Sequence, residues 1–377
     1  TLKKKSNRYL YNINNFKDFW MFLKKLKNEI KFSRKIRISN LGKTFIVAEI
    51  SANHSGSLRL LKKTMLKAKL SGADAVKIQS YQANTMTLDS RNKNFLINDK
   101  SIWKGKYLYS LYQKAETPFK WHKEIFKFAK KNKILCFSAP FDPSAVELLE
   151  KCGCPIYKLA SPEIEDLRLI RKIAKTKKPI IISTGIANED DIKRALKICL
   201  EEKNNSIILL NCISSYPAKN CELNLIYIKK LKKYSPIVGY SDHSNSDLAS
   251  LISISLGAKV IEKHFILNKK INSPDKTFSH DPKEFKNLVK KIRLAEEMLG
   301  KEKIDKKEIL KGKLKTITRS IFYSANIKKG NKITENNIKS VRPGNGLSLI
   351  FYEKILGKKL LRSVKFGDPV RLSHIKY

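Results

Sequence analysis

The chain has 377 residues, 42% of them hydrophobic, which is enough for the cores of one large and one small domain and too much for a disordered chain. No run of about 18 uncharged apolar residues occurs, and no apolar stretch follows the basic start, so we expect neither a membrane span nor a secretory signal. The net charge of +44 comes from lysines scattered along the chain, and we interpret it as composition bias rather than as a nucleic-acid-binding surface.

Residues 1–38 form a basic extension that contains several aromatic residues. Residues 14–36 within it have the spacing of an amphipathic helix. This pattern favours packing against the main domain, with binding of a partner as the alternative.

Eight short β-rich runs follow, with helical patterns between them. The spacing predicts strands over 45–50, 74–79, 134–138, 156–160, 179–183, 206–211, 236–240 and 259–265, and helices that include 58–70, 121–131, 191–203, 247–256 and 282–299. Nearly continuous apolar strands that alternate with helices are typical of a parallel sheet covered on both faces. Residues 39–300 are therefore predicted to form a closed (β/α)₈ TIM barrel, an α/β fold. An open doubly wound sheet is the alternative, but no Gly-rich loop follows the first strand.

The composition and residue pattern change after the predicted barrel. Residues 301–315 are rich in lysine and predict a linker, and residues 316–377 combine short strand-like pieces with turns such as Lys329-Gly330-Asn331. Short strand-like pieces separated by such turns predict a small, mainly β domain. The six cysteines are spread over a long chain, mostly in apolar runs, which indicates reduced thiols and a cytoplasmic protein.

Polar residues fall where the predicted strands end. In a (β/α)₈ barrel the chemistry lies at the carboxyl ends of the strands, and a buried Lys or His is costly unless it is partnered. The pattern therefore favours an active site over satisfied core polar groups. Its members are Glu49, Lys77, Gln79, Ser138, Lys158, Ser161, Glu163, Ser183, Asn211, Ser214, Tyr216, Ser241, Asp242, His243, Glu262, Lys263 and His264.

Two histidines, His243 and His264, end neighbouring predicted strands, so their imidazoles could converge on one divalent cation. The carboxylates of Asp242 and Glu262 beside them favour a metal over a pair of hydrogen-bonded structural imidazoles. Two His without a Cys set indicate an open site, with water or substrate in the remaining positions.

Two lysines, Lys77 and Lys158, point into the same predicted mouth. With the hydroxyls of Ser138, Ser161 and Ser183 they make a plausible pocket for an anion, phosphate above all. A Schiff-base lysine, as in barrel aldolases, is the competing interpretation.

These residues lie in motifs through which the chain resembles the sialic acid (nonulosonic acid) synthase family. The resemblance covers residues 38–377, and the stretches 85–90 and 103–122 are most similar to the pseudaminic acid branch. The motifs are AEISANHSGS (48–57), GADAVKIQSYQANTMTLDS (72–90), WKGKYLYSLYQKAETPFKWH (103–122), CFSAPFDPSAVELLE (136–150), YKLASPEIEDLRLI (157–170), IISTGIA (181–187), GYSDHS (239–244), EKHF (262–265), SPDKTFSHDPKEF (273–285) and RPGNGLS (342–348).

The family resemblance implies a barrel followed by a SAF (antifreeze-like) domain, in a domain-swapped homodimer whose SAF domain covers the partner's active site. It implies Mn²⁺ or Mg²⁺ on His243 and His264, and a base, Glu49, for the water that adds to phosphoenolpyruvate. The residues implied for phosphoenolpyruvate are Lys77, Lys158, Ser161, Ser183, Ser214, Tyr216 and Ser241, and those implied for the sugar are Gln79, Glu163, Asp275 and Arg342.

The resemblance also implies the substrates: phosphoenolpyruvate and an N-acetylated amino sugar, which the pseudaminic branch makes 2,4-diacetamido-2,4,6-trideoxy-L-altrose. N-acetylneuraminate and legionaminate synthesis are the alternatives within the family, and a Schiff-base aldolase or a basic nucleic-acid-binding protein are those outside it. Two positions depart from the sialic acid synthases: Ala139 stands where Thr is common, and Ser214 where some carry Asn. We expect Ser138 or another donor to compensate for the hydroxyl missing at Ala139.

Overall fold

The computed structural model describes residues 16–32, 36–98, 103–300 and 313–376, and the chain divides into two compact units, Thr1–Gly300 and Lys301–Tyr377. Most of the predicted linker, residues 301–312, lies outside the described residues. No helix among those described is long and apolar enough to cross a membrane.

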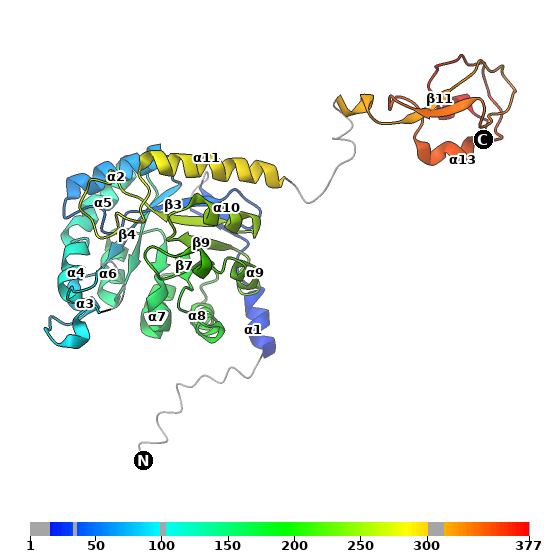
Figure 1. Ribbon diagram of the computed structural model, residues 1–377. Helices are drawn as coiled ribbons and strands as arrows, with labels where there is room; N and C mark the ends of the chain where they lie inside the picture. Colours follow the sequence, from blue (N-terminus) through cyan, green and yellow to red (C-terminus); the bar gives the residue numbers. More distant parts are fainter. Residues whose placement is uncertain (1–15, 33–35, 99–102, 301–312, 377) are drawn as a thin grey trace. The chain divides into compact units, whose positions relative to one another are not determined.

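The first unit contains a closed barrel of eight parallel strands (Figure 1), which confirms the predicted (β/α)₈ fold. The last strand pairs with the first over five residues, from Val260 opposite Phe45 to His264 opposite Glu49, and this pairing closes the barrel. The strands are β3 (Phe45–Glu49), β4 (Ala75–Ser80), β5 (Cys136–Pro140), β6 (Tyr157–Leu159), β7 (Ile180–Ser183), β8 (Ile207–Cys212), β9 (Val238–Asp242) and β10 (Val260–His264).

Helices surround the strands, and most of the longer ones bury one face. In α7, for example, Leu169, Ile170, Ile173 and Ala174 are buried at helical spacing, and the Asp166 side chain caps the amino end. The helices of this unit, besides α1, are α2 (Leu58–Leu70), α3 (Ala83–Met86), α4 (Leu108–Ala115), α5 (Phe119–Lys131), α6 (Pro143–Lys151), α7 (Leu167–Lys175), α8 (Glu189–Glu201), α9 (Tyr227–Leu231), α10 (Asp247–Ser255) and α11 (Pro282–Leu299).

The amino-terminal segment corrects one prediction. The helix expected over residues 14–36 is the shorter α1 (Phe16–Leu23), and it is followed by an antiparallel pair, β1 (Glu29–Lys31) and β2 (Arg37–Ser39). Ile30 and Ile38 face each other in this pair and are buried in the same apolar core as the barrel. Two β-branched residues that can be buried across a strand pair favour strands over a continued helix.

The second unit has its own small core. Its strands β11 (Ser320–Tyr323) and β12 (Ile338–Val341) pair in antiparallel fashion, and isolated bridges such as Ile327–Val364 and Leu360–Ile375 extend the β character. Ile321, Ile333, Ile338, Ile355 and Val370 are buried among one another. Short helical turns complete the unit: η5 (Lys313–Thr316), η6 (Leu349–Phe351), α13 (Tyr352–Ile355) and η7 (Leu372–His374).

Candidate active site

A buried ammonium joins two carboxylates at the centre of the barrel mouth. Lys77 Nζ on β4 lies 2.7 Å from Glu49 Oε2 on β3 and 3.0 Å from Glu262 Oε1 on β10. Burial lowers the pKa of Lys77 to about 8, although Glu262 acts to raise it. Burial also acts to raise the pKa of Glu262, but Lys77 and Lys158 outweigh it and hold that pKa below its usual value. The cluster therefore keeps charge inside the barrel.

The hydrogen bonds of His243 fix its tautomer. Its Nδ1 lies 2.7 Å from the carbonyl oxygen of Ile213 and must donate to it, so Nε2 carries the free lone pair. Ser241 Oγ lies 3.4 Å from that Nε2 and donates to Glu262 Oε1 at 2.9 Å. Burial lowers the pKa of His243 to about 4, so at neutral pH its imidazole is uncharged and able to bind a cation.

His264 faces His243 across the mouth, with 5.5 Å between the ring centroids. Its Nδ1 is buried without a hydrogen bond and lies 3.7 Å from Asp275 Oδ2. Burial lowers the pKa of His264 well below its usual value, and repulsion from a protonated His243 and from Lys77 acts in the same direction. A buried nitrogen without a hydrogen bond, next to a second imidazole with a free lone pair, suits a divalent cation. Among the described residues no group of three or more His, Cys, Asp and Glu side chains is placed to hold a metal ion.

Aromatic rings surround the two imidazoles. The Tyr216 ring centroid lies 4.4 Å from that of His243, and the Phe278 centroid lies 4.8 Å from that of His264. Trp103 extends the group, with its ring 5.9 Å from Tyr216. Burial raises the pKa of Tyr216, so its hydroxyl stays protonated. These rings keep water away from one side of the imidazoles.

The loop that carries Asp275 and Phe278 is fastened by Asn53, which follows β3. Asn53 Nδ2 donates to the Phe265 carbonyl at 3.1 Å and to Ser279 Oγ at 2.8 Å, and its Oδ1 accepts from Ser273 Oγ at 2.6 Å. The Ala52 amide donates to Asp275 Oδ2 at 3.3 Å. The first βα loop thus holds the last one over the mouth.

A second group of donors lies around Lys158 on β6. Lys158 Nζ donates to Ser183 Oγ at 2.7 Å and to the Leu159 carbonyl at 3.2 Å. Gly185 lies close by, and a Cβ on it would come within 2.9 Å of Ser214 Oγ and 3.1 Å of Ser161 Oγ. Hydroxyls and an ammonium, the kinds of donor that bind oxyanions, thus gather around Gly185, where an added methyl would displace them.

Glu163 and Gln79 flank these groups. Glu163 lies in the η3 turn (Ser161–Glu165) just after β6, and its buried Oε2 has no hydrogen bond. Burial raises the pKa of Glu163 to about 7, with Lys158 opposing. Gln79 follows Lys77 by two residues on β4, so it shares the inward face of that strand, and it is half-buried.

Ser138 is not part of the site. Its hydroxyl lies 2.6 Å from Ser80 Oγ, which lies 2.6 Å from His122 Nε2 on α5. The chain of contacts therefore runs outward, between the barrel and its helix layer. Side chains alternate along a strand, so Ala139 and not Ser138 faces the interior beside Gln79. Ser138 cannot supply the hydroxyl missing at Ala139.

Two further predicted site residues lie in surroundings that differ from the predicted ones. Asp242, expected beside the imidazoles, is buried against Lys263 at 3.2 Å and so is not available to a cation. Arg342 lies in the second unit, just after β12, where it is exposed. Its predicted contact with substrate stays a prediction.

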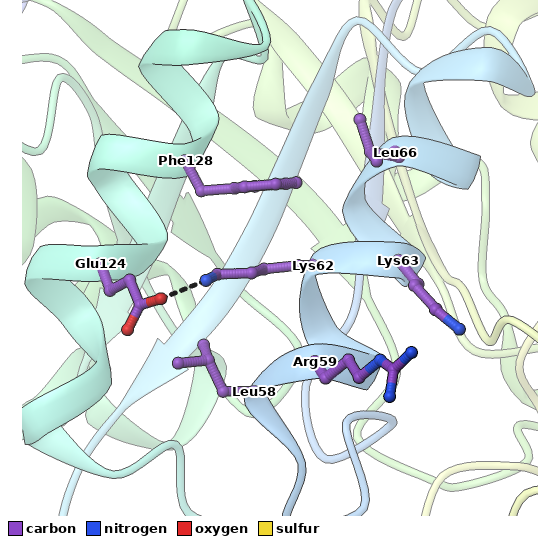
Figure 2. Close-up of a pocket in the computed structure, with 7 residues that line it drawn as sticks. All are labelled: Leu58, Arg59, Lys62, Lys63, Leu66, Glu124 and Phe128. Atoms are coloured by element: carbon purple, nitrogen blue, oxygen red, sulfur yellow. Dashed lines mark hydrogen bonds and ion pairs between the residues drawn. The ribbon is translucent and has the colours of Figure 1, made fainter.

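Hollows also lie outside the cluster, and two of them border the mouth and the outer face of the barrel. One of about 670 Å³ borders the Trp103 side of the mouth and contains Lys106, Gln113, Lys114 and Lys276 but no acidic side chain. The other, of about 400 Å³, lies between α2 and α5 on the outer face (Figure 2), where Lys62 pairs with Glu124 next to the Phe128 ring. None of the predicted site residues lines either hollow.

The sequence alone did not assign three contributors. Glu262 was predicted as a strand-end carboxylate beside the imidazoles, and its contacts with Lys77 and Ser241 were not predicted. Gly185, which has no Cβ, lets Ser161 and Ser214 lie close to its backbone, and Phe278 packs on His264. The inward position of Glu262, two residues before His264, was a signal that alternation could have supplied.

Comparison with known proteins shows the family to which the chain belongs. Residues 64–304 match the NeuB family, and residues 318–376 match the SAF domain. The chain belongs to the NeuB family, and the predictions of a nonulosonic acid synthase fold and of an enzyme are confirmed.

Particular relatives narrow the comparison. The chain is 46% identical over 331 residues to pseudaminic acid synthase of Campylobacter jejuni, covering 87% of this chain and 96% of that one. It is 44% identical over 334 residues to pseudaminic acid synthase of Helicobacter pylori, covering 88% and 97%. Among solved structures, sialic acid synthetase from Leptospira borgpetersenii has a TM-score of 0.67 at 30% identity, covering 76% of this chain and 95% of that one.

Proposed function

We propose that this chain is a pseudaminic acid synthase, which condenses phosphoenolpyruvate with 2,4-diacetamido-2,4,6-trideoxy-L-altrose and releases phosphate. The observation that carries the proposal is the buried cluster of Glu49, Lys77 and Glu262 beside the two uncharged imidazoles. The high identity to pseudaminic acid synthases, against 38% to N,N'-diacetyllegionaminic acid synthase of C. jejuni, favours this product over legionaminate.

In the proposed reaction, C3 of phosphoenolpyruvate attacks the aldehyde carbon of the open-chain sugar and forms the new C–C bond. Water adds at C2, Glu49 takes one proton from that water, and Lys77 holds Glu49 ionised and in place. Glu163, with its raised pKa, is the candidate donor of a proton to the sugar oxygen that was the aldehyde. The C2–O bond to the phosphate then breaks, and the C2 hydroxyl gives its proton to the departing phosphate and becomes the ketone carbonyl. Glu49 releases its proton to solvent and Glu163 takes one up, so no net proton is gained or lost by the enzyme.

Lys158 and the surrounding hydroxyls are proposed to hold the phosphate. Their convergence around Gly185 supports this, because donors set in advance stabilise charge that develops on the leaving group. His243 and His264 would hold a divalent cation, Mn²⁺ or Mg²⁺, which when bound polarises the sugar aldehyde. The lowered pKa values of both imidazoles, the free lone pair on His243 Nε2 and the unpaired Nδ1 of His264 support this assignment.

The remaining assignments follow the family resemblance. Gln79 and Asp275 are proposed to contact the sugar, Tyr216 is proposed to line the phosphoenolpyruvate side, and Arg342 would reach the sugar from the SAF domain of a partner in a domain-swapped homodimer. Ser241 is proposed to assist phosphoenolpyruvate through Glu262. A cytoplasmic location stays a prediction from the cysteine pattern.

The test is phosphate release from phosphoenolpyruvate with Mn²⁺, comparing the L-altrose substrate with N-acetylmannosamine and the legionaminate precursor. We expect turnover with the L-altrose sugar and loss of turnover after treatment with EDTA. Turnover with another sugar alone would move the chain to another branch of the family. Borohydride inactivation in the presence of pyruvate, with no effect of EDTA, would replace the proposal with a Schiff-base aldolase.

A further inference from the structure

A fully buried ion pair lies directly behind the two imidazoles. Asp242 precedes His243 at the end of β9, and Lys263 precedes His264 at the end of β10. Asp242 and Lys263 are partners in the register of these strands, and Lys263 Nζ lies 3.2 Å from Asp242 Oδ2. Because side chains alternate along a strand, this pair faces the helix layer while Ser241 and Glu262 face the interior.

Asp242 and Lys263 both form hydrogen bonds with the turn that contains His243. Asp242 Oδ1 accepts from the Ser244 amide at 2.9 Å and from Ser244 Oγ at 2.7 Å. Lys263 Nζ donates to the Ser244 carbonyl, and Ser250 Oγ on α10 donates to Asp242 Oδ2 at 2.7 Å. The amide, hydroxyl and carbonyl of Ser244 are therefore all bonded to this pair. His243 stands between two residues that cannot move independently.

Stability alone does not account for such a pair. Taking two charges out of water is costly, and apolar residues of similar volume often serve the fold as well or better. An apolar pair, however, could not bind the three polar groups of Ser244. The distinctive effect of the charged pair is geometric, because it ties the turn that contains His243 to β10, the strand that carries His264.

We infer that Asp242 and Lys263 are positioning residues that set the direction of His243 and its spacing from His264 for a shared divalent cation. The inference rests on the proposed metal site. Neither residue touches the cation; both act through the imidazoles, in the way that outer groups orient metal ligands.

Calorimetric titration of the metal-stripped full chain with MnCl₂ tests the inference. We expect Asp242→Asn and Lys263→Met to weaken Mn²⁺ binding about 10- to 100-fold. The double variant Asp242→Leu, Lys263→Met leaves no unpaired buried charge, so it should melt at a higher temperature than either single variant, though below wild type because Ser244 loses its partners, and should bind Mn²⁺ no better than the single variants. Ser250→Ala is a milder variant that removes one donor to Asp242, and it should weaken binding by a few-fold.

A matched control lies at the other end of the barrel. Asp74 Oδ2, just before β4, also lies 3.2 Å from its cation, Arg293 Nη2, and accepts from the Ile46 amide. Asp74→Asn should lower the melting temperature without changing Mn²⁺ affinity. Unchanged affinity in the folded double variant and in Ser250→Ala would overturn the positioning role alone. A wild-type chain that binds no Mn²⁺ would overturn the metal site, and the positioning role with it.

Discussion

Lys77 Nζ lies 2.7 Å from Glu49 Oε2, and both side chains are buried where the first two strands of the barrel end. The ammonium favours the ionised carboxylate, which is the form that can accept a proton from water. Glu49 Oε1 has no hydrogen bond in the structure, so one carboxylate oxygen remains for such a water.

Glu49→Gln tests this arrangement. The amide keeps the shape but cannot act as a base, so we expect kcat to fall about 100- to 10,000-fold in the phosphate-release assay. Glu124→Gln on α5, which removes the partner of Lys62 on the outer face, is the control and should leave kcat unchanged. Retention of near-normal turnover by folded Glu49→Gln would remove Glu49 from the mechanism.

The carboxyl group of Glu163 should make stability depend on pH. Burial raises its pKa to about 7, so the folded state binds the proton more tightly than the unfolded state. This contribution is fully present below the unfolded pKa of 4.5 and is lost as the pH rises through about 7.

Urea unfolding at pH 5 and pH 8 measures the effect. The free energy of unfolding of wild type should be lower at pH 8 than at pH 5. This decrease should exceed that of Glu163→Gln, which has no titrating group at residue 163, by up to about 3 kcal/mol. Equal pH dependence in both proteins would show that Glu163 is not protonated in the fold. If Glu163 is also the proton donor, Glu163→Gln should lose the decline of kcat above pH 7.

Gly185→Ala should damage the proposed phosphate space selectively. The added methyl would come within 2.7 Å of Cys212 Sγ and 2.9 Å of Ser214 Oγ, so we expect the KM for phosphoenolpyruvate to rise roughly tenfold, or about 1.4 kcal/mol. The KM for the sugar should change little. Gly42→Ala, whose methyl would meet only Ser39, serves as control, and an unaltered phosphoenolpyruvate KM in Gly185→Ala would place the phosphate elsewhere.

Ser138→Ala distinguishes a structural serine from a substrate ligand. The substitution removes the bonds of Ser138 Oγ with Ser80 and with the Ile78 carbonyl, so we expect a loss of about 1–3 kcal/mol in the free energy of unfolding. Neither KM nor kcat should change. A raised KM for phosphoenolpyruvate would mean that Ser138 reaches the substrate after all.

The repeating pattern of the sequence determined the barrel and the place of its active site. Eight apolar runs alternating with helical ones leave few other ways to bury both faces of a parallel sheet, and polar residues at the carboxyl ends can then only gather at one mouth. His243, His264, Lys77 and Glu49 were predicted on this basis, and the structure brings them together.

The tertiary structure decided which side of each strand a residue faces and which residues meet across the closed barrel. Ser138 and Ala139 are adjacent in sequence, and only the register with β4 shows that the alanine faces inward. Glu262 reaches Lys77 because β10 closes on β3, a contact between residues at opposite ends of the barrel sequence. Asp242 was likewise predicted to lie beside the cation, but in the structure its carboxylate pairs with Lys263. Sequence periodicity records local burial, whereas these pairings depend on long-range contacts that no local pattern encodes.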